Sequence, residues 1–267
     1  MDLKLKWKIA YQSICLIQHY QNGKLIASGT GFKVGNELVT NNHVFFCDYS
    51  THTLIKFVNA DSYSENLSQE FSKEEFQALL IKGSTENFWD FAVFDISNTK
   101  FCSLPSLMLC NSEINILIGS KIYFLGFPLL QNNLTIHGGN VSSKYTTENG
   151  VKYIQIDGSV NSGNSGGALF DYETETIIGI VTRKQTGLTK KFNELKNSVK
   201  QNIDHLQQVT TIGVGGIIGS GVIGGIDQNK ALITIQAQLD LLTEEIFRSA
   251  NVGIGYAFEL DEVRKYL

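Results

Sequence analysis

Short apolar segments alternate with turns that contain glycine and asparagine through the first two-thirds of the chain. Two of these turns, Gln21-Asn22-Gly23 and Gly35-Asn36, each lie between two such segments, which is the pattern of a β-hairpin. Further strand candidates follow at regular spacing, at residues 53–58, 91–96, 121–125, 135–142, 153–156, 168–172 and 177–182. Many short strands separated by glycine-containing turns indicate a β-sandwich or a β-barrel. We therefore expect an all-β core.

Two segments in this part of the chain depart from the strand pattern. Ser72 followed by Glu75 has the spacing of a capping box, and apolar residues recur at helical spacing from Phe76 onward. This predicts a short surface helix within 68–81. Lysines alternate with apolar residues over 3–8, which favours a solvated strand or chain end there.

The segment Gly163-Asn164-Ser165-Gly166-Gly167 frames one serine with glycines. Glycine lets the backbone turn tightly, so the N–H groups of Gly163 and Ser165 can point at one spot. Two such donors could stabilise an oxyanion that forms beside the hydroxyl of Ser165. The segment on its own could also be a simple loop.

A histidine and an aspartate with suitable surroundings precede this serine. His43 lies in Thr40-Asn41-Asn42-His43-Val44, and Asp90 begins the apolar segment 90–96. The order His43, Asp90, Ser165 is that of the chymotrypsin-type triad. Asp95 is the rival aspartate, but strand alternation places it on the opposite face from Asp90. The other histidines lack a comparable setting and are expected at the surface; they are His19, His52, His137 and His205.

Together these motifs resemble those of the trypsin-like serine proteases, most closely the protease domain of the HtrA (Deg) type without its PDZ domain. The resemblance covers roughly residues 12–182 and 251–267. Its motifs are Ser28–Phe32, Leu38–Phe45, Asp90–Ile96, Asp157, Gly163–Gly167 and Gly253–Phe258.

The resemblance implies a fold and a division of the site. It implies two six-stranded antiparallel β-barrels, the first over 1–105 with His43 and Asp90, the second over 106–267 with Ser165. It also implies a pocket for the substrate side chain, with walls at Ser159, Val160, Ile180, Val181, Thr182 and Arg183. Ser159 stands where trypsin carries an acidic residue, so cleavage after Lys or Arg is not favoured and a small or medium apolar side chain is expected.

Residues 184–251 are an insertion relative to the resembled family. Apolar residues three or four apart predict amphipathic helices over 188–209 and 230–248, and hence an inserted α-helical hairpin. The linker 210–226 is uncharged and rich in glycine. The hairpin could pack passively on a barrel, or it could gate the site or bind a regulatory protein. The linker is short for a membrane span, and a gate, a partner-binding segment and a packed loop are its other interpretations.

Composition restricts the remaining possibilities. A net charge of −4 offers no basic surface for nucleic acid. The 4 cysteines lack metal-site spacing, so neither a metal nor a cofactor is expected. Scattered cysteines without a visible secretion signal favour a cytoplasmic location and free buried thiols.

The sequence therefore predicts a serine endopeptidase that cleaves proteins or peptides and is gated by the insertion or by a partner. Two alternatives stay open. One is a catalytically silent binding module on a protease fold, and the other is a membrane-acting effector that uses 210–226.

Overall fold

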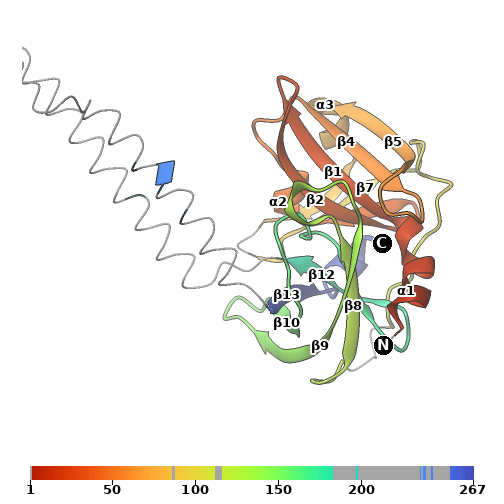
Figure 1. Cartoon of the computed structure of the whole chain (residues 1–267), viewed down its shortest axis with the longest axis vertical. Helices are drawn as coiled ribbons and strands as arrows, with labels where there is room; N and C mark the ends of the chain where they lie inside the picture. The colour runs from red at the N-terminus through yellow and green to blue at the C-terminus, as the bar shows by residue number, and fades with distance from the viewer. Residues whose placement is uncertain are drawn as a thin grey trace, which may run out of the picture. The chain divides into compact units, whose positions relative to one another are not determined.

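The computed structural model describes residues 2–85, 88–111, 116–182 and 253–267, and the single residues 197, 235, 237, 238 and 242 (Figure 1). The chain divides into one unit made of Met1–Lys184 and Val252–Leu267 and another made of Gln185–Asn251. The helices expected at 188–209 and 230–248 and the linker 210–226 therefore lie outside the described residues, apart from those single positions. The inserted hairpin stays a prediction.

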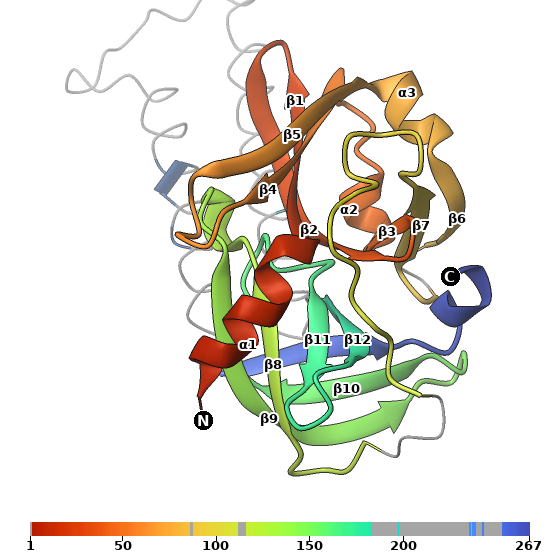
Figure 2. The same ribbon diagram turned by 90° about the vertical axis from the view of Figure 1, so that its right-hand side faces the viewer.

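The N-terminal half of the first unit is a seven-stranded antiparallel sheet (Figure 2). Its strand order is β5-β4-β1-β2-β3-β7-β6. The bounds are β1 Ile14–Gln21, β2 Lys24–Val34, β3 Glu37–Thr40, β4 His52–Val58, β5 Glu65–Ser72, β6 Leu80–Ser84 and β7 Phe91–Asp95. The predicted β1–β2 hairpin is confirmed, and Asn22 and Gly23 both have positive φ, at 50° and 74°, as a tight hairpin turn requires.

The C-terminal half is a closed barrel of six strands in the order β10-β13-β12-β11-β8-β9. The bounds are β8 Lys121–Gly126, β9 Thr135–Thr146, β10 Lys152–Asp157, β11 Ala168–Asp171, β12 Ile177–Thr182 and β13 Ile254–Glu259. A short 3-10 turn, η2 (Pro128–Leu130), follows β8, and another, η4 (Val263–Tyr266), ends the chain. One of the two expected barrels is thus confirmed.

The second expected barrel is not confirmed, because the N-terminal sheet ends at β5 and β6 without a ladder between them in the described residues. Helix α3 (Lys73–Ala78) stands between these two strands in the chain, and its Phe76 is 2% exposed within the core of this half. The predicted capping box of Ser72 and Glu75 is present. The helix is shorter than predicted because residues up to Ser72 pair with β4.

The N-terminal segment is a helix, α1 (Leu3–Ala10), and the expected strand or solvated end is wrong. The side chain of Asp2 accepts a hydrogen bond from the N–H of Lys4 and caps its start. Leu3, Trp7 and Ala10 follow helical spacing, and they pack into a core cluster that contains residues of both sheets. None of the helices in the described residues is long and apolar enough to span a membrane.

This shared cluster joins the two halves of the first unit. It contains Leu16 and Phe32 from the N-terminal sheet and Tyr123 and Phe170 from the barrel, all fully buried. Because interiors are close-packed, such a cluster fixes the two sheets against each other. Side chains from one half can therefore be held at a defined place beside the other.

Candidate active site

His43 lies in α2 (Asn42–Phe45), a single helical turn that follows β3. Its backbone N–H donates to Oδ1 of Asp90 at 3.1 Å, and its ring Nδ1 lies 2.8 Å from Oδ2 of the same carboxylate. Asn41 holds the backbone of Asp90, since its Nδ2 donates to the Asp90 carbonyl at 2.8 Å. The Asp90 carboxylate therefore orients the imidazole and has two of its acceptor positions occupied by His43.

Asp90 precedes β7 in an unusual backbone conformation, with φ at +36°. Aspartate tolerates positive φ better than most residues, but the conformation still needs support from its surroundings. The bonds from Asn41 and His43 give that support, and Asp90 is 3% exposed. The rival Asp95 instead accepts bonds from the N–H and hydroxyl of Ser97, which hold the pKa of its carboxyl below the usual range. Of these two aspartates, Asp90 is the one that binds His43.

The loop between β10 and β11 carries Ser165, which is 5% exposed. Thr30 of β2 binds this loop twice: its N–H donates to the Ser165 carbonyl at 2.9 Å and its hydroxyl to the Gly163 carbonyl at 2.6 Å. The Thr30 carbonyl in turn accepts a bond from the hydroxyl of Thr40, at the end of β3, at 2.6 Å. The serine loop is therefore tied to the strand from which the His43 turn begins.

Glycines allow this close approach. A Cβ atom on Gly166 would lie 2.1 Å from the Thr30 carbonyl oxygen and 3.1 Å from the backbone nitrogen of Asn41. Gly166 also has a φ of +87°, in the region that side chains disfavour. The residue after Ser165 thus packs directly against a residue two positions before His43, so the structure brings the three predicted catalytic residues into one area.

The predicted oxyanion donors are free of backbone partners among the described residues. The N–H groups of Asn164, Gly166 and Gly167 donate to backbone carbonyls, whereas those of Gly163 and Ser165 donate to none there. Gly163 has a φ of +96°, and a Cβ on it would lie 2.1 Å from the Phe127 carbonyl oxygen. This position therefore needs glycine, as the sequence predicted for a tight turn.

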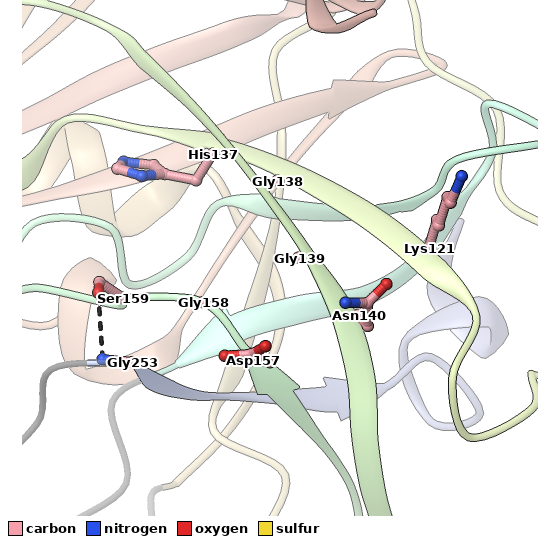
Figure 3. Close-up of a pocket in the computed structure, with 9 residues that line it drawn as sticks. All are labelled: Lys121, His137, Gly138, Gly139, Asn140, Asp157, Gly158, Ser159 and Gly253. Atoms are coloured by element: carbon pink, nitrogen blue, oxygen red, sulfur yellow. Dashed lines mark hydrogen bonds between the residues drawn. The ribbon is translucent and has the colours of Figure 1, made fainter. Parts of the chain in front are cut away.

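A hollow of about 530 Å³ lies beside Ser159, one of the predicted pocket residues (Figure 3). The Ser159 hydroxyl accepts a hydrogen bond from the N–H of Gly253 at 3.1 Å. The lining residues are mostly polar or glycine, and they are Lys121, His137, Gly138, Gly139, Asn140, Asp157, Gly158, Ser159 and Gly253. Burial lowers the pKa of His137, so its ring is neutral at pH 7.

Most of the residues predicted for the pocket wall do not line this hollow. The side chains of Val160, Ile180 and Val181 are at most 3% exposed and lie in hydrophobic core clusters, and none of the three lines this hollow. Ile180 and Val181 are neighbours in β12 and point to opposite faces of the barrel wall, and both faces are covered: Ile180 packs in the cluster shared with the N-terminal sheet, and Val181 packs in the barrel cluster that also contains Val160. Thr182 is also buried, at 3% exposure, and Arg183 lies outside the described residues.

Two histidines that we expected at the surface are not there. His19 is 1% exposed and His137 lines the hollow with its ring stacked on Phe124. For His19 the available signal was the apolar run that precedes it, since the first six residues of β1 are all buried. For His137 no sequence signal was available, because the hollow forms from β8, β9 and the end of β10.

The described residues contain no group of three or more His, Cys, Asp or Glu side chains placed to hold a metal ion. Of the four cysteines, Cys15 and Cys110 are buried, as expected, but Cys102 is exposed and Cys47 half-buried. The groups available for chemistry at this site are thus the imidazole of His43, the carboxylate of Asp90, the hydroxyl of Ser165 and backbone N–H groups.

The family model and the curated relatives that match this chain all belong to trypsin-like serine proteases. A model of the trypsin-like peptidase domain matches residues 29–180. A probable periplasmic serine endoprotease, DegP-like, from Hahella chejuensis is 33% identical over 159 residues, which cover 58% of this chain and 29% of that protein. Periplasmic serine endoprotease DegP from Escherichia coli is 30% identical over 169 residues, covering 61% and 31%. Serine protease HTRA1A from Danio rerio is 30% identical over 169 residues, covering 60% and 31%.

Solved structures agree on the fold. The HtrA-type protease AlgW with tripeptide matches with a TM-score of 0.53 at 22% identity, over 68% of this chain and 54% of that chain. The serine endoprotease from Yersinia pestis matches with a TM-score of 0.52 at 23% identity, over 68% and 57%. The fold of the first unit is therefore trypsin-like.

These relatives also correct one expectation. The chain spans only 28% to 31% of the length of the curated relatives it matches. The bacterial ones are named as periplasmic endoproteases, which contradicts the expected cytoplasmic location. That expectation depended on scattered cysteines, and free thiols buried in a core, such as those of Cys15 and Cys110, do not discriminate between compartments.

Proposed function

Because the chain belongs to the trypsin-like peptidase domain family, we propose that it is a serine endopeptidase that cleaves protein or peptide substrates through His43, Asp90 and Ser165. The observation that carries the proposal is the double contact between His43 and Asp90 beside the serine loop. A carboxylate on Nδ1–H fixes the imidazole tautomer and leaves Nε2 unprotonated. An unprotonated Nε2 is the base that a serine hydroxyl needs.

In the proposed reaction each step uses a group of this chain. The Oγ of Ser165 attacks the carbonyl carbon of the scissile peptide while its proton moves to Nε2 of His43. The N–H groups of Gly163 and Ser165 stabilise the oxyanion that forms. The C–N bond then breaks, and the leaving amine takes the proton from His43. Water attacks the resulting ester with His43 again as base, which releases the acid product and restores the Ser165 hydroxyl.

The hollow beside Ser159 is the proposed place for the substrate side chain next to the scissile bond. Its lining includes one cation, Lys121, and one anion, Asp157, together with the neutral ring of His137. Such a lining favours a neutral polar side chain, in place of the small apolar one expected from the sequence. Thr182, the last residue of β12, and Arg183, which follows it in the chain, stay proposed residues of the pocket wall.

We keep the proposed division into residues 1–105 and 106–267, with 184–251 as an insertion that gates the site or binds a regulatory partner. Support comes from where the insertion attaches. It joins β12 to β13, which pair through Thr182 and Tyr256, and the chain re-enters the described residues at Gly253, beside the hollow. The names of the bacterial relatives support a periplasmic site of action.

Hydrolysis of unfolded casein tests the proposal. The native chain, Ser165→Ala, His43→Ala and a chain shortened across 184–251 should be compared, each with its fold checked by circular dichroism. We expect cleavage by the native chain that both point variants abolish. Cleavage only by the shortened chain would show an inhibitory insertion. Absence of cleavage by folded native and shortened chains would favour the silent binding module, and vesicle leakage that requires 210–226 would favour the membrane effector.

A further inference from the structure

His19 is a buried histidine of β1 whose ring contacts the helical turn that carries His43. Its Nε2 lies 2.6 Å from the carbonyl oxygen of Val44, and its Nδ1 lies 2.9 Å from Oγ1 of Thr53. Thr53 is directly opposite His19 in the β1–β4 register, and it is fully buried. Val44 is the residue that follows His43. A side chain of the sheet core thus reaches the backbone next to the proposed catalytic base.

The two partners determine which ring nitrogen of His19 carries the proton. A carbonyl oxygen only accepts hydrogen bonds, so Nε2 must carry the hydrogen and donate to Val44. Nδ1 is then unprotonated and accepts from the hydroxyl of Thr53. Burial lowers the pKa of His19, which favours this neutral form.

The bond matters because α2 is too short to satisfy its own carbonyl groups. The carbonyls of Asn41 and Asn42 accept the bonds inside the turn, and those that follow have no partner within it. The carbonyl of Val44 lies where water is excluded, since Val44 is 5% exposed and His19 is 1% exposed. An unpaired buried carbonyl is unfavourable, so His19 supplies the partner that lets the turn stay in this place.

Packing holds the side chain of the same residue. A Cβ atom on Gly29 of β2 would lie 2.4 Å from Cγ1 of Val44, so the Val44 side chain fills the space that this glycine leaves. The turn is therefore anchored by His19 from β1, by Gly29 from β2 and by Asp90 through His43.

We infer that His19 is a positioning residue for the proposed base His43, and that it acts through the carbonyl of Val44. The inference rests on the proposed function, because it assigns His43 a catalytic task. Small displacements of a reacting group, of the order of 1 Å, can lower a rate by about 100-fold. Loss of the His19 bond should therefore lower the reactivity of Ser165 without changing any group that touches the substrate.

The test uses the full chain with four changes. His19→Leu removes both ring bonds, and His19→Gln keeps one donor and one acceptor on a side chain of similar length. Thr53→Val removes the hydroxyl that donates to Nδ1, so the ring loses the bond that keeps Nε2 directed at the Val44 carbonyl, and this variant serves if His19→Leu does not fold. Phe101→Leu is the matched control, because its ring contacts are with Phe57 and Phe71 of the same core.

Two readouts are needed. One is the rate of labelling of Ser165 by a fluorophosphonate, and the other is the downfield proton resonance of the His43–Asp90 hydrogen bond, assigned by its loss in His43→Ala. We expect His19→Leu to lower the labelling rate by roughly 10- to 100-fold and to shift or broaden the resonance. His19→Gln should restore much of both, and Phe101→Leu should lower the melting temperature with both readouts unchanged.

An unchanged labelling rate and resonance in folded His19→Leu or Thr53→Val would overturn the inference. The same holds if Phe101→Leu moves both readouts as far as His19→Leu does, since the effect would then be one of core stability. If neither the native chain nor the chain shortened across 184–251 is labelled, the proposed function fails, and the resonance still decides whether His19 positions His43.

Discussion

The two halves of the proposed site are built in opposite ways. On the N-terminal sheet, side chains hold the site: Asn41 and His43 bind Asp90, and His19 binds the carbonyl of Val44 in the turn that carries His43. On the barrel, the site depends on residues without side chains: Gly163 and Gly166 have positive φ and no space for a Cβ atom.

This difference follows from the task of each half. A base must be oriented by hydrogen bonds, so its half needs polar atoms in a dry setting. An oxyanion site uses backbone N–H groups, so its half needs a chain that can turn sharply and approach its neighbours. We therefore expect activity to fall when polar atoms are removed from the N-terminal half and when atoms are added to the glycines of the barrel.

Asp90→Asn should give the largest effect of these changes, because the amide can no longer fix the tautomer of His43. We expect kcat to fall by about 10⁴-fold, the magnitude known for the same change in the well-studied Ser-His-Asp triad. Asp95→Asn is the control, since its carboxylate binds Ser97 and not His43. Steady-state peptide hydrolysis measures both, and equal losses would break the assignment of Asp90.

Gly163→Ala tests the barrel half by adding one carbon. The new Cβ would lie 2.1 Å from the Phe127 carbonyl oxygen, so the loop must shift and its N–H must move. Loss of one oxyanion donor lowers kcat by about 10² to 10³. Gly150→Ala adds the same carbon at a φ of +79° but with no atom within 4 Å. It should reduce stability without reducing kcat of the folded protein. Similar kcat losses in both variants would contradict the claim that the lack of space around Gly163 matters for the oxyanion site.

His137→Leu asks whether the polar hollow selects the substrate. Replacing the neutral imidazole by an apolar group removes a hydrogen-bonding partner, which is worth up to roughly tenfold in relative kcat/KM. A peptide library varied at the residue before the scissile bond should then show a shift from neutral polar toward apolar side chains. His52→Leu is the control, since His52 stacks on Tyr20 of the other sheet. An unchanged profile in His137→Leu would exclude the hollow as the specificity pocket.

The smallest expected effect is on the pH dependence of stability. Burial lowers the pKa of His19 in the folded chain below its ordinary value of 6.5. The unfolded chain therefore binds more protons below that pH, so this contribution to stability is complete above about 6.5 and declines as the pH falls. The melting temperature of His19→Gln should change less between about pH 7 and pH 5 than that of the native chain. If the melting temperatures of the two proteins change equally with pH, the pKa of His19 does not differ between the folded and unfolded chain.

The motifs in the sequence indicated which residues lie near one another better than they indicated what surrounds those residues. His43, Asp90 and Ser165 each sit in a short motif, and the structure brings the motifs together. The role of His19 could not be predicted, because it depends on β1 being buried along its first six residues and on its register with β4. The hollow beside Ser159 was missed for a similar reason, since three separate strand regions form it.

Fold predictions failed where local pattern and tertiary packing disagree. The lysines near the N-terminus suggested a strand, yet Leu3, Trp7 and Ala10 also fit helical spacing, and packing on the shared core selects the helix. The capping box at Ser72 was predicted correctly because it is a local feature. Whether the N-terminal sheet closes into a barrel depends on contacts between strands that are far apart in the sequence. No local motif predicts such contacts.

The most direct test of the central claim is to locate the fluorophosphonate adduct by mass spectrometry on the native chain, with Ser165→Ala and His43→Ala alongside. We expect one adduct on Ser165, absent from the first variant and strongly reduced in the second. An adduct on another serine, or none on a folded chain both with and without residues 184–251, would contradict it.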